Sequence, residues 1–247
     1  YAEHDILIAA CGTGRHAFYI AQQFPASRIL AIDLSRASLA YARTMTRKAG
    51  LSNIEYAQAD ILKLATIGRT FDRVEAIGVL HHLAEPKAGL RALLALLKPN
   101  GVMRIGLYSE AARRAIAEAR ELAAERGYKA TADGIRALRQ AVIGKRDEDR
   151  FKALLATSAD FYCMSGCRDM FFNAMEHRFA IPQIAALLEE HGLSFLGFDL
   201  DEETIVAFRR RYPGAAALAN LDNWHDFEIA HPDTFRRMYV FSVKRGS

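Results

Sequence analysis

The chain has 247 residues, of which 51% are hydrophobic and 25% are charged, and its formal net charge is +4. This composition is typical of a globular protein, and no apolar run approaches the length of a membrane span, which excludes a membrane-spanning segment from the prediction. The arginines of 113–120 and 209–211 stand among acids or aromatics. That pattern favours solvated helix faces over a basic patch, so we do not expect a nucleic-acid partner.

The cysteines indicate the redox environment of the protein, and the start of the chain indicates whether sequence precedes it. Cys11, Cys163 and Cys167 are too few for a disulfide framework, and the last two lack the spacing of a zinc or redox motif. We therefore expect reduced, partly buried thiols in a cytoplasmic protein and predict no metal site. The first strand pattern begins within a few residues of Tyr1, so we expect sequence upstream, such as a fused domain.

Strands and helices are predicted to alternate over the first 108 residues. The expected elements are buried strands at 6–9, 28–32, 53–57, 71–79 and 102–108, with helices at 16–24, 35–50 and 90–97. This alternation predicts an α/β fold with a doubly wound, mostly parallel sheet.

The pattern becomes mostly helical over 110–180 and returns to sheet architecture at Pro182. The expected elements are helices at 110–126 and 135–143, an aromatic and polar run at 160–172, a helix at 183–191, a strand at 194–200, a helical stretch at 202–219 and a last strand at 238–243. We therefore predict an α/β core of residues 1–109 and 181–247, with an inserted helical cap of residues 110–180.

A glycine-rich loop follows the first strand. Gly12-Thr13-Gly14-Arg15-His16-Ala17 fits the dinucleotide pattern G-x-G-x-x-A. Gly12 and Gly14 allow a sharp turn and a close approach of a ligand, and the helix that begins near Arg15 offers free N–H groups to a carboxylate or phosphate. The loop alone does not identify the ligand.

Two acidic residues at strand ends indicate which ligand the glycine loop binds. Asp33 ends the second strand, where it can bind ribose hydroxyls, although a helix N-cap is the alternative for this residue. Asp60 ends the third strand, where a second acid suits an adenine amino group. A dehydrogenase does not need this acid, the chain has no Tyr-x-x-x-Lys pair, and a second nucleotide-binding half is missing.

Five stretches in this order and spacing resemble the class I S-adenosylmethionine-dependent methyltransferases: ILIAACGTG (6–14), AIDLS (31–35), AQADIL (57–62), FDRVEAIGVLHHL (71–83) and LLKPNGVMRIGLYS (96–109). The resemblance implies a Rossmann-like sheet of seven strands whose last strand, 238–243, is antiparallel. A looser resemblance, through GVLHHL, LYSE, SGCRD and EHRF, is to the methyltransferase domain of bacterial tetratricopeptide-repeat proteins.

The resemblance also implies a set of cofactor contacts. The loop of Ala10, Cys11, Gly12 and Gly14 would pass under the methionine part of S-adenosylmethionine. Asp33 would bind the ribose and Asp60 the adenine amino group, while Leu34 and Ile61 would contact the two faces of the adenine ring. Val79 to His81 would lie near the sulfonium. The family usually has an acid where this chain has Ile8, and a glycine where it has Ala10. The contact to the methionine amino group is therefore in doubt, and Ala10 is tolerable in a tight loop if its φ is negative.

Candidate residues for the reacting end come from two regions. His81 and His82 follow the fourth strand, where a histidine can act as a base, or His81 packs against the loop and His82 caps the next helix. In the cap we consider Tyr162, Glu176 and His177 as catalytic candidates, and Arg168, Arg178 and Tyr108 as substrate-binding candidates. The alternative is an internal network that ties cap to core, with Asp169 paired to Arg168 or Arg178.

The sequence thus predicts a methyltransferase that acts on a small molecule or a protein side chain. Two alternatives remain open, a methyltransferase-fold binding module with a weakened cofactor loop and an NAD-dependent oxidoreductase. RNA is not expected as acceptor, because Gly78-Val79-Leu80-His81-His82 stands where base methyltransferases often carry an Asn-Pro-Pro-Tyr-like run.

Overall fold

The computed structural model describes residues 3–236 and 238–246. Within these ranges seven strands form one sheet in the order β3-β2-β1-β4-β5-β7-β6, and β7 is the strand that runs antiparallel to its neighbours. The strands are β1 (Asp5–Ala9), β2 (Arg28–Asp33), β3 (Ile54–Gln58), β4 (Phe71–Ile77), β5 (Leu97–Leu107), β6 (Leu193–Phe198) and β7 (Tyr239–Arg245). The predicted doubly wound, mostly parallel sheet is confirmed.

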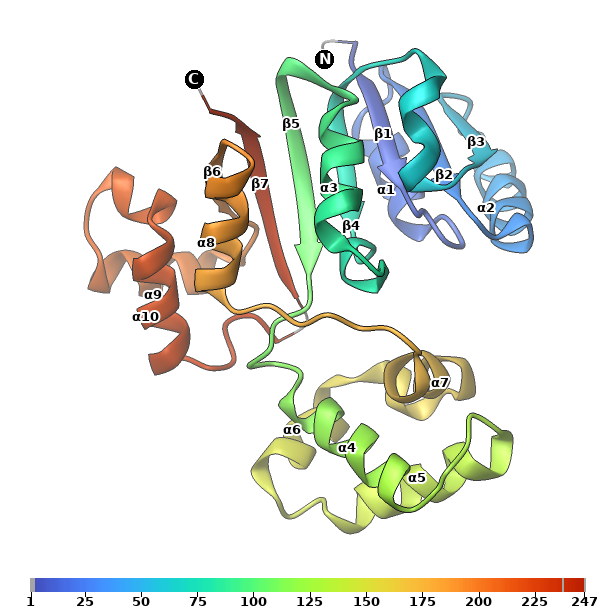
Figure 1. Ribbon diagram of the computed structural model, residues 1–247, viewed down its shortest axis with the longest axis vertical. Helices are drawn as coiled ribbons and strands as arrows, with labels where there is room; N and C mark the ends of the chain where they lie inside the picture. Colours follow the sequence, from blue (N-terminus) through green and yellow to red (C-terminus); the bar gives the residue numbers. More distant parts are fainter. Residues whose placement is uncertain (1–2, 237, 247) are drawn as a thin grey trace.

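Helices cover both faces of the sheet (Figure 1). On one face lie α1 (Arg15–Gln23) and α2 (Arg36–Lys48), and Ile6 and Ile8 of β1 pack against their apolar sides. The other face carries α3 (Pro86–Leu94), α8 (Ile181–Glu190), α9 (Glu202–Arg211) and α10 (Leu221–Ala230). Successive side chains of β1 alternate between the two faces of the sheet. Because helices cover both faces, the strand is apolar on both sides, as buried parallel strands are.

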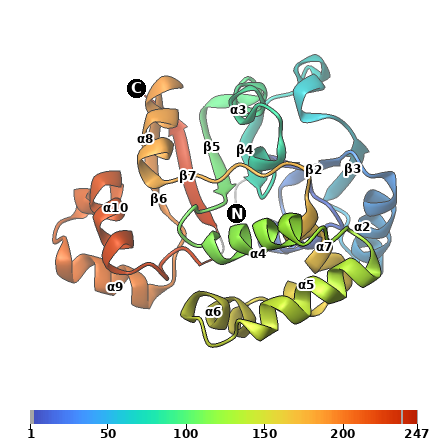
Figure 2. The same cartoon turned by 60° about the horizontal axis from the view of Figure 1, so that its bottom comes forward.

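The helices between β5 and α8 form a separate cluster with its own hydrophobic core. This cap consists of α4 (Arg114–Glu125), α5 (Ala132–Gly144), α6 (Asp149–Thr157) and α7 (Met164–Phe172). Figures 1 and 2 show it at the edge of the sheet toward which the arrowhead of β5 points. That edge collects the carboxyl ends of the parallel strands, where ligands bind in open α/β sheets.

Two predicted boundaries differ from the structure around β5. The helix predicted at 90–97 is α3 at Pro86–Leu94, because Pro86 takes the first helical turn, where proline is favoured. Leu97 pairs with Phe71 instead of ending the helix, so β5 begins five residues before the predicted strand.

The helical stretch predicted at 202–219 is also interrupted. It breaks at Pro213 and Gly214 into α9 and the 3₁₀ helix η4 (Ala215–Ala219), and the helix α10 that follows was not predicted. The side chain of Asn220 caps α10 by accepting the N–H of Asp222 at 2.8 Å. Within the cap, α6 was not predicted either.

A buried carboxylate ties α10 to the sheet. The Tyr239 hydroxyl donates to Glu228 at 2.8 Å, and the Ser109 hydroxyl donates to the same carboxylate at 3.2 Å. Burial raises the pKa of Glu228, and the bonds from Tyr239 and Ser109 oppose that rise. Ser109 follows β5 and Tyr239 begins β7, so this contact joins α10 to both strands at the cap edge.

Ala10 has a backbone conformation that alanine rarely adopts. Its φ is +53°, whereas an alanine was expected to fit here only if its φ were negative. The left-handed conformation costs a residue with a Cβ about 1–2 kcal/mol. The loop is therefore locally strained at the position where the resembled family has glycine.

We predict that Ala10→Gly raises the free energy of unfolding by up to about 1 kcal/mol, since the relieved strain exceeds the extra entropy of an unfolded glycine. Urea denaturation measures this change. Ala57→Gly, at an exposed strand position of β3, is the matched control and should lower the free energy by about 0.5–1 kcal/mol. A loss of stability in Ala10→Gly would contradict the assigned strain.

Candidate active site

The loop after β1 is fixed by backbone hydrogen bonds. The Cys11 N–H donates to the Ile32 carbonyl at 2.8 Å, and the Gly14 N–H donates to the Cys11 carbonyl at 2.9 Å. Gly14, the N-cap residue of α1, has a φ of +86°, and a Cβ there would lie 2.5 Å from the Cβ of Ala42. Only glycine fits this position, because α2 packs directly against the turn.

Asp33 braces the same loop from the end of β2. Its Oδ2 accepts the Gly12 N–H at 2.7 Å, and its Oδ1 accepts the Ser35 N–H at 2.8 Å. Each oxygen of an ionised carboxylate has a further lone pair, so Asp33 can brace the loop and still accept a hydroxyl hydrogen bond. The two predicted roles of Asp33, bracing the backbone at the start of the next helix and accepting a hydrogen bond from a ligand, are geometrically compatible.

The adenine-side candidates lie at the ends of β2 and β3. Asp60 accepts the Leu62 N–H at 3.0 Å and so begins the 3₁₀ helix η1 (Ile61–Ile67). Leu34 is 67% exposed, whereas Ile61 is buried in the hydrophobic core. Of the two predicted apolar faces, Leu34 is the one that offers open surface.

Cys11 is not a reactive thiol in this structure. Burial, with the nearby charge of Asp33, raises its pKa to about 12. It thus stays protonated and packs in the core under the loop.

His81 is enclosed where β4 ends. It belongs to the 3₁₀ helix η2 (Leu80–His82) and has no exposed surface, and its ring stacks on Tyr108 with the centroids 3.7 Å apart. Burial, together with the charges of His82 and Arg113, lowers its pKa to about 3. Neither ring nitrogen has a hydrogen-bond partner among the described residues. His81 is therefore a neutral imidazole with unused hydrogen-bonding capacity.

An ion-pair network joins the cap to this histidine. Arg113 lies over the Tyr108 ring, 3.7 Å from its centroid, and donates to both oxygens of Glu176 at 2.8 and 2.6 Å. Arg120 contacts the same carboxylate at 3.1 Å. The prediction of a solvated face for Arg113 and Arg120 is wrong, because both side chains turn inward toward Glu176. Their separation from Glu176 in the sequence gave no signal of this pairing.

The segment 175–179 crosses the ends of β4 and β5. The His177 N–H donates to the His81 carbonyl at 2.8 Å, and the Phe179 N–H donates to the Tyr108 carbonyl at 2.9 Å. The ring of His82 contacts the Met175 carbonyl at 3.0 Å through Nδ1, so His82 does not cap α3. The Nε2 atom of His177 is buried and without a partner among the described residues.

The remaining candidates lie farther from His81 or face solvent. Tyr162 is 56% exposed and donates its hydroxyl to the Leu155 carbonyl at 2.9 Å, within the cap. Arg168 and Arg178 are exposed. The structure thus brings together His81, Tyr108, Glu176 and His177, and it leaves Tyr162 outside this group.

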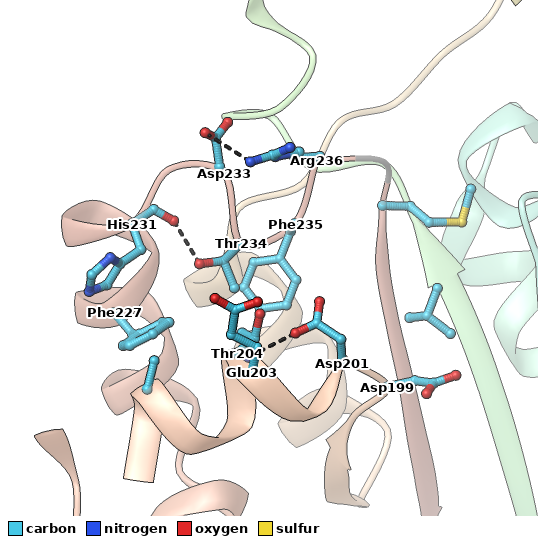
Figure 3. Close-up of a pocket in the computed structure, with 13 residues that line it drawn as sticks. Asp199, Asp201, Glu203, Thr204, Phe227, His231, Asp233, Thr234, Phe235 and Arg236 are labelled. Carbon is cyan, nitrogen blue, oxygen red and sulfur yellow. Dashed lines mark hydrogen bonds and ion pairs between the residues drawn. The ribbon is translucent and has the colours of Figure 1, made fainter. Parts of the chain in front are cut away.

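A cavity of about 850 Å³ opens beside the same sheet edge, between the end of β6, the start of α9 and the loop that leads into β7 (Figure 3). Most of its acids have local partners: Asp199 pairs with Arg104, Asp201 accepts the Thr204 N–H, and Asp233 pairs with Arg236. Met238 lines the cavity and packs against Gly106 of β5. The cavity therefore adjoins the end of β5 from the β7 side.

Among the residues of the described ranges, no helix combines the length and apolar character needed to cross a membrane.

The chain is similar to known methyltransferases in sequence and in fold. Residues 6–101 match the family described as a methyltransferase domain. An uncharacterized protein of Synechococcus sp., syc1184_c, is 32% identical over 208 residues, which are 78% of this chain and 48% of that protein. The ubiquinone biosynthesis O-methyltransferase of Methylocella silvestris is 37% identical over 98 residues, which are 40% of this chain and 37% of that protein.

Among solved structures, PKMT2 from Rickettsia typhi in complex with AdoHcy shares the fold, with a TM-score of 0.74 at 18% identity over 98% of this chain and 49% of that one. The chain thus spans about half the length, or less, of these relatives. The matched family and the strand order agree with one another. Residues 6–101 thus match a methyltransferase domain, and the sheet that contains them has the fold of a solved methyltransferase structure.

Proposed function

We propose that this protein transfers the methyl group of S-adenosylmethionine to a small molecule or a protein side chain. The observation that carries the proposal is the meeting of the glycine loop, Asp33 and Asp60 at one edge of the sheet, next to the point where the strand order reverses between β1 and β4. Ligands of doubly wound sheets bind at such points.

The cofactor roles follow from what each group can offer. Gly12, where a Cβ would meet nothing within 4 Å, leaves room for the methionine part, beside the free N–H groups at the start of α1. Asp33 has lone pairs left for ribose hydroxyls, and Asp60 has them for the adenine amino group. Leu34 offers one exposed apolar face to the adenine ring.

We propose that the substrate that receives the methyl group binds under the cap, beside His81, Tyr108, Glu176 and His177. S-adenosylmethionine is already activated, so the protein has mainly to position the acceptor and exclude water. His81 and His177 bring unpaired ring nitrogens to this place, whereas Glu176 is occupied by two arginines. We propose that neutral His81 accepts a hydrogen bond from the group of the substrate that receives the methyl. The exposed Arg168 and Arg178 would bind an anionic part of the substrate.

The names of relatives support a small-molecule acceptor. Besides the ubiquinone biosynthesis enzyme, a trans-aconitate 2-methyltransferase of Paracidovorax citrulli is 28% identical over 65% of this chain. The alternative, a binding module without turnover, is motivated by Ile8 and by the strained Ala10.

Two measurements test the proposal. Calorimetry with S-adenosylhomocysteine and with NAD identifies the cofactor, and binding of NAD but not of S-adenosylhomocysteine would refute the assignment. Incubation of the protein and a cell extract with S-adenosylmethionine labelled in its methyl group then reveals the acceptor fraction. Tight cofactor binding without any labelled product would favour the binding module.

The adenine contact makes a specific prediction. We expect Asp60→Ala to raise the dissociation constant of S-adenosylhomocysteine about tenfold, because a hydrogen bond to a charged group is lost. Calorimetry provides the measurement. Asp72→Ala is the matched control, since Asp72 pairs with Lys98 at the opposite edge of the sheet and should bind the ligand as the wild type does. Equal affinity in Asp60→Ala would remove Asp60 from the site.

The burial of neutral His81 makes stability depend on pH. Below pH 6.5 the unfolded chain protonates this imidazole, while the folded protein does not until about pH 3. The unfolded state then binds more protons, so stability falls as the pH falls, by about 2 kcal/mol between pH 7 and 5.

We expect His81→Phe, which keeps an aromatic ring against Tyr108, to lose this part of the pH dependence of the unfolding free energy. Tyr108→Phe retains His81 and should keep the wild-type dependence. Identical curves for His81→Phe and the wild type between pH 7 and 5 would show that His81 is not held neutral in the fold.

A further inference from the structure

Glu75 is a carboxylate in the middle of the central strand β4, and it has no exposed surface. Its Oε2 lies 3.0 Å from Nε2 of His16, its Oε1 contacts Nε of Arg73, and Arg104 approaches at 3.4 Å. Burial would raise the pKa of Glu75, but the bond from His16 and the charge of Arg73 outweigh it, and the pKa lies below its usual range. A buried ionised carboxylate needs such partners to be stable in the fold.

The position of Glu75 relates it directly to the cofactor loop. Glu75 is in register with Ile8 of β1, so the two side chains project from the same level and the same face of the sheet. That face is covered by α1, and His16 reaches Glu75 from the second residue of this helix, just after Gly14. Ile8 brings only hydrocarbon to this level, and the carboxylate comes from the neighbouring strand.

The charges around Glu75 pair with one another without His16. Glu75 and Asp199 are two carboxylates, and Arg73 and Arg104 are two guanidiniums that pair with them. The group is balanced without a charge on His16. Because a carboxylate only accepts hydrogen bonds, a neutral His16 ring donates from Nε2 and keeps an acceptor lone pair on Nδ1.

The second ring nitrogen is available to a ligand. The His16 side chain is 31% exposed, and Nδ1 has no hydrogen-bond partner among the residues that the structure describes. The ring lies at the start of α1, where the loop would carry the amino-acid end of the cofactor. An ammonium group there needs acceptors, and the helix start itself offers donors only.

We propose that Nδ1 of His16 accepts a hydrogen bond from the ammonium group of S-adenosylmethionine, and that Glu75 is the positioning residue that fixes the required tautomer. This inference rests on the proposed function, and it identifies what orients the cofactor amino group in a chain with isoleucine at position 8.

The test uses His16→Gln. Its side-chain amide can donate to Glu75 from the place of Nε2, so the buried carboxylate keeps its partner, but glutamine brings no acceptor to the place of Nδ1. Two ligands are compared by calorimetry, S-adenosylhomocysteine and 5′-methylthioadenosine, which lacks the amino-acid part. We expect the variant to bind the first about tenfold more weakly and the second as the wild type does. His4→Gln, just before β1, is the matched control.

The outcomes separate this inference from the proposed function. If the wild type binds neither ligand, the proposed function fails. If the wild type binds both, and His16→Gln either keeps its affinity for S-adenosylhomocysteine or weakens both ligands equally, the assignment of His16 is overturned.

A second measurement does not depend on any variant. The ring ¹⁵N resonances of His16 in the wild type should show a protonated Nε2 and an unprotonated Nδ1. In Glu75→Gln, whose amide can either donate or accept, we expect the two tautomers to mix and the affinity for S-adenosylhomocysteine to fall. A proton on Nδ1 in the wild type would overturn the proposal.

Discussion

The reversal of strand order between β1 and β4 is the constraint on which the site depends. Strands added after β3 lie on the other side of β1, so the loop after β1 and the turn after β4 end at one edge with no strand between them. The glycine loop, Asp33 and Asp60 follow on one side of this point, and His81 and Tyr108 on the other. The chemistry proposed here requires both sets, one for the cofactor and one for the acceptor.

Much of this arrangement could be predicted because it depends on local patterns. Apolar runs that end in Gly12, Asp33 or Asp60 indicate buried parallel strands, and parallel strands carry their ends to the same edge. The pairs that close the site could not be predicted in this way. Glu75 and His16 are 59 residues apart, and Arg113 and Glu176 are 63 apart. Their charges look the same in the sequence as those of a solvated surface.

Backbone detail escaped prediction for a related reason. Ala10, with its positive φ, lies in a loop held by the hydrogen bond between Cys11 and Ile32 and by the packing of α2 against Gly14, which are tertiary contacts. The helix α10 was missed because the exposed Asp222 and the buried Glu228 weaken the apolar pattern, although Trp224 and Phe227 anchor it in the core. In both cases the deciding partner lies on another element of the fold.

The way in which the cap joins the core has an evolutionary consequence. The chain leaves the sheet at Ser109 and returns at Phe179, and these two residues form a parallel bridge with one another. The insertion therefore departs and arrives at adjacent points, like an extended loop, and its helices have a hydrophobic core of their own. Such a segment can be exchanged by recombination without altering the register of any strand. Such an exchange would replace the helices at the carboxyl ends of the strands and leave the glycine loop and the strand register as they are.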